Sequence, residues 1–165
     1  MTIDQRYWDS DCFLGWLQDE ADKVDGCKQV LSAAEDGKIL IVTSALTIAE
    51  VLALRGRLKI PVTERAKVEK FFRHEYIVVR NITRRISEAA RTYVWDYGVD
   101  PKDALHVATA VDAGLPLLNT FDKPLIKKSG KIGNPTLLIE QPSWVEPKLP
   151  MDMPKDRQSD KTPKK

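Results

Sequence analysis

Short runs of consecutive apolar residues alternate along the chain with longer segments in which apolar residues recur every three or four positions. The short runs lie at Ile39–Val42, Tyr76–Val79 and Leu115–Leu118, and Thr136–Ile139 is a further candidate. Runs of this length without alternating polar residues are typical of strands buried on both faces. Pro116 stands near the start of its run, where a strand tolerates proline. The pattern therefore predicts three buried strands and allows a fourth.

Helical periodicity fills the segments between these strands. One apolar helical face is formed by Ile86, Ala89, Ala90, Tyr93 and Tyr97. Another helix is predicted to begin with Asp100 as its N-cap and Pro101 at its first position, and to end at Gly114. Strands that alternate with helices predict an α/β domain with a mostly parallel sheet.

The composition is that of an ordinary soluble domain, with 42% apolar and 30% charged residues in a chain of 165. Residues 147–165 contain six Lys or Arg against three Asp, which is +3, so the other 146 residues carry 20 basic and 21 acidic residues, which is −1. Because this C-terminal segment has almost nothing to bury, we expect residues 147–165 to be a disordered basic tail with a modest attraction for nucleic acid.

Several classes of protein are disfavoured by the sequence. Cys12 and Cys27 are too few for a disulfide framework, and their spacing matches no zinc site. Residues 1–11 are polar and charged, unlike a signal peptide. No apolar run approaches the roughly 20 residues that span a bilayer. We therefore expect a soluble cytoplasmic protein without a membrane segment.

Acidic residues follow the predicted strands or open the next helix, and ligands of parallel sheets bind at the carboxyl ends of strands. The four acids are Asp9, Glu50, Asp103 and Asp122. Each has a local explanation: Asp9 and Asp122 can be N-caps, Thr47-x-x-Glu50 fits a capping box, and Asp103 suits the first turn of its helix. Capping predicts four unrelated acids, whereas a metal site predicts that they meet in space.

Four segments, in order, resemble the PIN domain, the metal-dependent nuclease fold typified by VapC-type toxins. They are Asp9-Ser10-Asp11-Cys12-Phe13-Leu14, Ser44-Ala45-Leu46-Thr47-Ile48-Ala49-Glu50-Val51, Asp103-Ala104-Leu105-His106-Val107-Ala108-Thr109-Ala110 and Thr120-Phe121-Asp122. The resemblance covers residues 5 to about 140. It implies a PIN-like nuclease domain over residues 1–146, with three α/β/α layers around the sheet.

The resemblance also implies a divalent-metal-dependent ribonuclease that hydrolyses RNA phosphodiester bonds. Asp9, Glu50 and Asp103 would bind Mg²⁺ or Mn²⁺, and Asp122 would complete a second cation site. Carboxylate oxygens suit these hard cations, and a bound ion lowers the pKa of an attacking water. Family membership further implies an antitoxin protein that masks the site in a toxin–antitoxin pair, and frequent homodimers.

Residues beside the four acids leave alternatives open. Asp11 stands where many family members carry Asn, so it is either a further ligand or a helix cap. Ser10, Thr47 and Thr120 can hydrogen-bond a ligand, a water or a phosphate, or serve as cap and turn residues. His106 shares a helical flank with Asp103 and is either a general base or a packed, hydrogen-bonded core residue; the second is the commoner situation. His74 is a weaker candidate.

Residues 55–91 contain eleven Lys or Arg against four Glu, which suits RNA phosphates but also an ordinary solvated helix face. Two rival functions remain. Asp9-x-Asp11 also resembles the loop of haloacid-dehalogenase-type phosphatases, although Phe13 departs from that pattern and the reading leaves Glu50 and Asp103 unexplained. The second rival is a catalytically silent PIN-like module that binds RNA or a protein.

Overall fold

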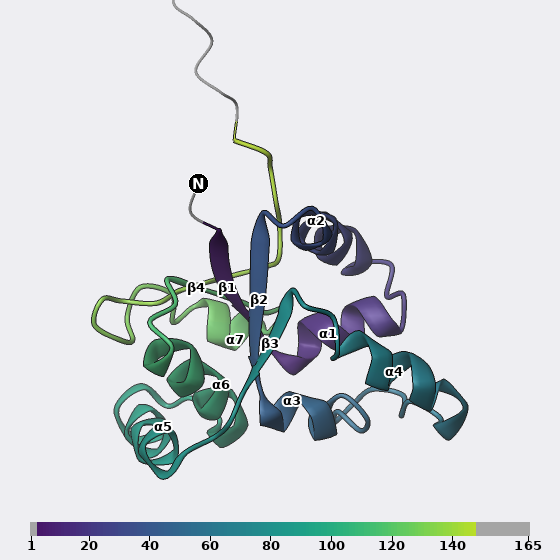
Figure 1. Cartoon of the computed structure of the whole chain (residues 1–165). Coiled ribbons are helices and arrows are strands. Elements are labelled where there is room, and N and C mark those ends of the chain that lie inside the picture. The colour runs from purple at the N-terminus through teal and green to yellow at the C-terminus, as the bar shows by residue number, and fades with distance from the viewer. Residues whose placement is uncertain (1–2, 148–165) are drawn as a thin grey trace, which may run out of the picture.

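The computed structural model describes residues 3–147, and five parallel strands form its single sheet (Figure 1). The strands are β1 (Asp4–Trp8), β2 (Ile39–Ser44), β3 (Ile77–Arg80), β4 (Leu117–Asn119) and β5 (Leu138–Glu140). Their order across the sheet is β3-β2-β1-β4-β5, and every neighbouring pair is parallel. The predicted parallel sheet is confirmed, including the fourth candidate strand.

Strand boundaries differ from the predicted ones for identifiable reasons. Strand β4 begins at Leu117 rather than Leu115, because the Leu115 N–H bonds the Ala110 carbonyl at the end of the preceding helix and Pro116 has no N–H to donate. Strand β5 begins at Leu138, because the Leu137 N–H donates to the Ile132 carbonyl in a turn and is not available to the sheet. These local hydrogen bonds displace each boundary by two residues.

Helices cover both faces of the sheet. They are α1 (Ser10–Leu17), α2 (Val24–Glu35), α3 (Ala45–Glu50), α4 (Arg65–Phe71), α5 (Arg84–Tyr97), α6 (Pro101–Asp112) and α7 (Lys123–Ile126), with a short 3₁₀ turn η1 (Val62–Glu64) before α4. Figure 1 shows α1, α2 and α4 on one side of the strands and α5, α6 and α7 on the other. The three-layer α/β/α architecture is therefore confirmed.

Successive side chains of the strands pack into two separate hydrophobic cores, one on each face of the sheet. Tyr7 of β1 packs with α5 and α6 through residues such as Ile86 and Val107, whereas its neighbour Trp8 packs on the opposite face with Phe13 and Val30. Successive side chains of a strand point to opposite faces, so an apolar residue at each position buries both sides of the sheet. This is why β2 reads as a nearly continuous apolar run, whereas β1 is apolar only at its last two residues, Tyr7 and Trp8.

The turn between α5 and α6 follows the predicted capping pattern. Helix α5 ends at Gly98, which adopts the left-handed conformation with φ of 61°. The Asp100 side chain then accepts a hydrogen bond from the Lys102 amide, and Pro101 occupies the first position of α6. This arrangement fixes the N-terminus of α6, and with it Asp103, at the carboxyl-end edge of the sheet.

None of the helices in residues 3–147 has the length and apolarity needed to cross a bilayer. Cys12 and Cys27 are both buried free thiols, and the Cys27 thiol lies 3.4 Å from the Cys12 carbonyl oxygen. The predicted tail lies outside the described residues, except for residue 147.

Candidate active site

The carboxyl ends of the central strands bring distant segments together. Tyr7 pairs with both Val42 of β2 and Leu118 of β4, so all three strands end at one level. The Asp9 amide donates to the Asn119 carbonyl at 3.3 Å. The chain turns into helices directly after β1 and β2, and their first residues line this edge.

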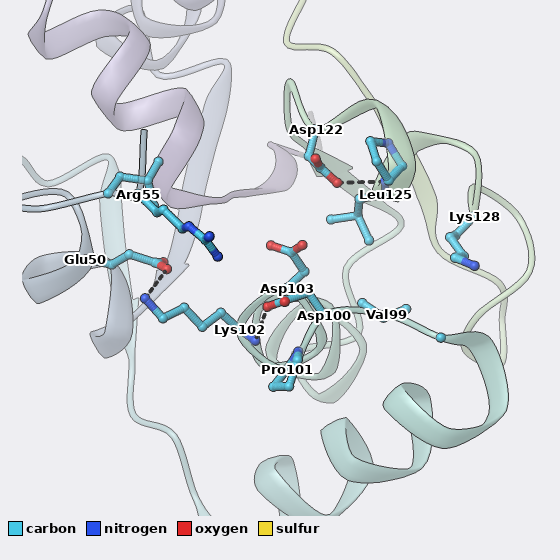
Figure 2. Close-up of a pocket in the computed structure, with 13 residues that line it drawn as sticks. Glu50, Arg55, Val99, Asp100, Pro101, Lys102, Asp103, Asp122, Leu125 and Lys128 are labelled. Carbon is cyan, nitrogen blue, oxygen red and sulfur yellow. Dashed lines mark hydrogen bonds and ion pairs between the residues drawn. The ribbon is translucent and has the colours of Figure 1, made fainter. Parts of the chain in front are cut away.

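Three of the four predicted acids line one open pocket of about 790 Å³ (Figure 2). Glu50 reaches it from the end of α3, Asp103 from the first turn of α6, and Asp122 from the residue preceding α7. Asp9 is only 4% exposed and is not part of the pocket lining. Its charge nevertheless contributes to the raised pKa of Asp103.

Glu50 is held by a buried hydrogen-bond network. The Ser10 hydroxyl donates to its Oε2 at 2.5 Å, and His106 Nε2 lies 2.9 Å from the same oxygen. Its other oxygen, Oε1, lies 3.4 Å from the ammonium of Lys102, a largely exposed side chain. Burial alone would raise the pKa of Glu50, but the bonds from His106 and Ser10 outweigh it and lower the pKa to about 2. The carboxylate is therefore fixed and ionised.

His106 is fully enclosed and uses both ring nitrogens. Its Nδ1 lies 2.7 Å from the Tyr7 hydroxyl, and Nε2 faces Glu50. Burial raises the pKa of Tyr7, which keeps its proton and can donate to Nδ1. The structure thus confirms the expectation of a packed, satisfied histidine, and the chain Tyr7–His106–Glu50 gives it a specific contact with a predicted ligand.

Asp9 and Asp103 carry raised pKa values. Burial, together with the charges of Asp122 and Asp9, raises the pKa of Asp103 to about 7. Burial also raises the pKa of Asp9 to about 6, although His106 and Thr120 partly offset it. Like charges and desolvation both favour protonation of a carboxyl group. A cation at this edge would relieve the repulsion.

The local capping explanations also apply to two of the acids. Asp9 accepts a hydrogen bond from the Cys12 amide at 3.1 Å, and Asp122 accepts one from the Leu125 amide at 2.8 Å. Each cap occupies one carboxylate oxygen. Thr120 is a turn residue, since its hydroxyl accepts from the Asp122 amide at 3.0 Å. Capping and a site at the sheet edge are thus compatible in these residues.

The predicted Thr47–Glu50 capping box is wrong. Helix α3 begins after Ser44, so Thr47 and Glu50 both lie inside the helix. The Thr47 hydroxyl bonds that of Thr43 at 2.8 Å and does not reach the pocket lining. With no capping role, Glu50 is free to contact Ser10 and His106.

The donor set fits a hard divalent cation in chemistry, but its atoms are not gathered around one point. Within residues 3–147, no three His, Cys, Asp or Glu side chains lie close enough together to hold an ion. The side chains of Glu50, Asp103 and Asp122 share one pocket, and oxygen donors of this kind suit Mg²⁺ or Mn²⁺. An ion held here in these side-chain positions would have at most two such ligands from the described residues, with waters or substrate oxygens completing its shell.

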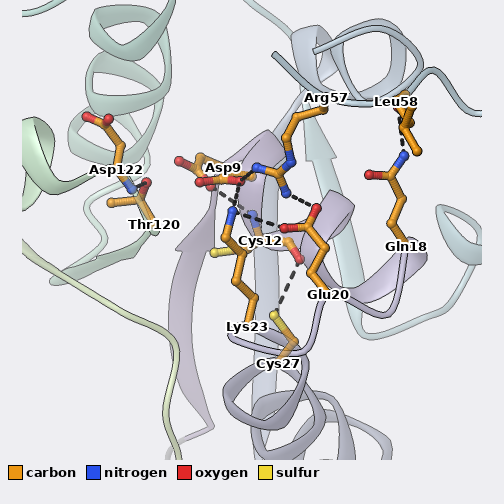
Figure 3. Close-up of polar contacts among 11 residues, drawn as sticks. Asp9, Cys12, Gln18, Glu20, Lys23, Cys27, Arg57, Leu58, Thr120 and Asp122 are labelled. Atoms are coloured by element: carbon orange, nitrogen blue, oxygen red, sulfur yellow. Dashed lines mark hydrogen bonds and ion pairs between the residues drawn. The ribbon is translucent and has the colours of Figure 1, made fainter. Parts of the chain in front are cut away.

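Asp11 takes part in a separate ion-pair cluster rather than the acidic pocket. Its Oδ1 lies 2.6 Å from Arg57 and 3.0 Å from Lys23. Both of these basic side chains also contact Glu20 (Figure 3). All four side chains are at most 20% exposed. The cluster ties the loop before η1 to the segment between α1 and α2, which explains the acid at this position without a metal.

Several basic residues of the segment 55–91 form ion pairs at the surface. Arg84 and Arg85 of α5 pair with Glu88 and Asp112, as expected of a solvated helix face, and Arg80 at the end of β3 also lies near Asp112. Arg55, by contrast, lines the acidic pocket together with two cations from other parts of the chain, Lys102 and Lys128.

Sequence reasoning did not identify several of these partners. Tyr7 is followed directly by the apolar Trp8 and looks like a core residue, and Arg57 and Lys128 lie in segments rich in basic residues, so no local pattern marks any of them as a partner. Lys102 offered one signal, because it directly precedes a predicted ligand at the start of a helix.

The fold and the pocket define an α/β protein with an acidic site at the carboxyl edge of a parallel sheet. The sequence profile of the PIN domain matches residues 6–131, and the chain belongs to the PIN domain family. No curated protein matches it significantly.

Solved structures share this fold. The chain resembles Mycobacterium tuberculosis VapC20, described as a Sarcin-Ricin loop cleaving toxin, with a TM-score of 0.59 at 13% identity over 71% of this chain and 89% of that one. It also resembles VapBC2 from Rickettsia felis, bound to a DNA fragment from its promoter, with a TM-score of 0.59 at 16% identity over 83% and 98% of the two chains. A toxin–antitoxin complex from Klebsiella pneumoniae gives a TM-score of 0.51 at 19% identity over 71% and 86%. At sequence identities this low, the similarity shows that the proteins share a fold and no more than that.

Proposed function

We propose that this protein is a divalent-metal-dependent endoribonuclease that hydrolyses RNA phosphodiester bonds. The observation that carries the proposal is the pocket itself. Carboxylates from α3, α6 and the start of α7 face one cavity, and burial together with the charges of Asp122 and Asp9 raises the pKa of Asp103. Such a concentration of negative charge opposes folding unless it serves a cation.

Glu50, Asp103 and Asp122 would hold Mg²⁺ or Mn²⁺, with Asp9 beside them. When bound, the ion supplies charge neutralisation and an activated water. The contribution of the chain is orientation: Ser10 and His106 fix Oε2 of Glu50, so its Oε1 is the oxygen that faces the pocket cations. Ionisation of Glu50 is complete at neutral pH because its pKa is about 2.

Basic side chains in the pocket support RNA as the substrate class. Arg55, Lys102 and Lys128 line the cavity that also contains the acids. A site for a lone cation gains nothing from positive side chains, whereas a site for a polyanion needs them to attract phosphates. RNA with its phosphates on these side chains would place one phosphodiester over the carboxylates.

The relatives support an antitoxin partner. The Klebsiella pneumoniae structure is a toxin–antitoxin complex, and the Rickettsia felis structure is a VapBC2 assembly on promoter DNA. We infer that this chain is the toxin of such a pair, that it acts in the cytoplasm, and that it forms homodimers. Size-exclusion chromatography with light scattering measures the last point directly; a monomer at micromolar concentration would refute it.

The test is RNA hydrolysis by the purified protein with Mn²⁺ or Mg²⁺, and with EDTA. We expect metal-dependent cleavage that falls by several orders of magnitude in Glu50→Gln and Asp103→Asn. Asp25→Asn, which alters an exposed acid on α2, is the matched control and should cleave normally. Binding of RNA by the wild type without any cleavage would favour the silent binding module instead. Normal cleavage by Asp103→Asn would refute the site.

A further inference from the structure

Trp95 on α5 is unusually exposed for its residue type. Its side chain is 73% exposed, whereas Trp8 is fully buried and Trp16 and Trp144 are partly buried. An indole in this position adds little to the core, because most of its apolar area remains in water. Its neighbours on the outer face of α5 include Arg91 and Glu88, so charged side chains flank the indole on that face.

Arg91 lies one helical turn before Trp95 and covers part of the indole. Its guanidinium carbon is 5.3 Å from the ring centroid, which is the geometry of a cation–π pair. A planar cation on a planar ring forms a flat, positively charged platform. Platforms of this composition bind nucleobases by stacking and attract the adjoining phosphates.

The platform borders a groove that meets the acidic pocket. A cavity of about 380 Å³ lies between α5 and α6, and Arg91, Trp95, Leu105 and Pro101 are among its lining residues. Pro101 also lines the acidic pocket, so the groove and the pocket adjoin at the first turn of α6. A ligand that crosses this turn would extend from Asp103 to Trp95.

We propose that this groove binds an unpaired base of the RNA strand, stacked on Trp95 and Arg91, on one side of the cleaved phosphodiester. The inference rests on the proposed ribonuclease function and adds a binding position to it. The apolar lining of the groove suits the face of a base, and Arg91 suits a phosphate. Because the groove adjoins the acidic pocket, a bound base would lie at a fixed position relative to the cleaved phosphodiester. A base in a duplex is already stacked on its neighbours, so the groove selects single strands.

RNA binding by the variants Trp95→Ala, Trp95→Phe and Leu138→Ala distinguishes a base stacked on Trp95 from non-specific binding to any exposed apolar side chain. Leu138 is an exposed apolar residue on β5 that lines neither cavity, so Leu138→Ala is the matched control. The probe is a short, fluorescently labelled single-stranded RNA that the wild type cleaves, titrated in EDTA to prevent turnover. We expect Trp95→Ala to bind it roughly 5- to 100-fold more weakly, as stacking free energies predict. Trp95→Phe should retain most of the affinity, and Leu138→Ala all of it.

Abasic substitution tests the contact directly. The same RNA is prepared with a single base removed at each position in turn. One position should weaken wild-type binding strongly and leave Trp95→Ala binding unchanged, which a merely structural role of the indole would not produce. Equal sensitivity of both proteins at every position would overturn the inference, as would equal affinity of Trp95→Ala and wild type.

Two further outcomes are decisive. If Trp95→Ala converts a dimer into a monomer in light scattering, the indole belongs to a protein interface and the inference is overturned. If wild-type protein neither binds nor cleaves RNA, the ribonuclease proposal itself fails. Cleavage by the wild type with no effect of Trp95→Ala on affinity or on kcat/KM overturns the stacking site alone.

Discussion

Replacing Asp103 by Asn should stabilise the metal-free protein while abolishing cleavage. Burial and the charges of Asp122 and Asp9 raise the pKa of Asp103 from 3.8 to about 7. The folded state therefore holds its proton more tightly than the unfolded state. The stability conferred by this proton is fully present below about pH 4 and is lost as the pH rises through about 7. Above that, the ionised Asp103 opposes folding.

The magnitude follows from the two pKa values. A difference of about three pH units corresponds to about 4 kcal/mol at full strength. Asp103 faces an open pocket, so screening by solvent reduces this to about 2 kcal/mol. Asn at this position also forfeits about 0.5 kcal/mol of interaction with the N-terminus of α6. The expected net gain at pH 8 is about 1.5 kcal/mol, or a rise in Tm of roughly 3–6 °C.

Urea unfolding in EDTA at pH 8 and pH 4 measures this effect. Asp103→Asn should exceed the wild type in free energy of unfolding at pH 8 and lose that advantage at pH 4. Asp25→Asn, an exposed acid on α2, should behave as the wild type at both values. An advantage that is equal at the two pH values would refute the reasoning, because it would not depend on ionisation of Asp103.

Three other predictions concern the same pocket. Mn²⁺ at about 100 times its Kd should raise the free energy of unfolding of the wild type by about 2.7 kcal/mol, and EDTA should reverse it in thermal melts; no shift would exclude a cation site. Tyr7→Phe removes the partner of His106 Nδ1, so urea unfolding should show a loss of about 1–2 kcal/mol with a lower cleavage rate. Lys128→Gln should reduce the slope of log affinity for single-stranded RNA against log salt by about 0.7. Lys127→Gln, beside it but outside the pocket, should leave that slope unchanged.

Local signals explain which features were predictable from the sequence. The start of α6 follows from Asp100 and Pro101, which act through hydrogen bonds and dihedral preferences within a few residues. The ion pairs of Asp11 depend on Arg57, 46 residues away, and on a loop whose path no short pattern determines. For this reason the sequence left Asp11 open between ligand and cap, whereas the structure pairs it with cations.

The same contrast applies to the pocket. The four acids were identified from strand ends and a family resemblance, but their separations depend on how α3, α6 and α7 pack on the sheet. The Thr47–Glu50 capping pattern was misleading because α3 starts one turn earlier, at the end of β2. The contact between Glu50 and His106 joins residues 56 positions apart and required the structure.

The two carboxylate oxygens of Glu50 have different contact partners. Ser10 and His106 anchor Oε2 inside the protein, whereas Oε1 meets only the exchangeable ammonium of Lys102 among the contacts of the described chain. In the proposed site, a cation bound at Oε1 would displace that ammonium without disturbing the anchor. The released Lys102 would then be available to a phosphate. Uptake of a cation and binding of a polyanion would thus be thermodynamically linked through one side chain, and each should tighten the other by the same factor.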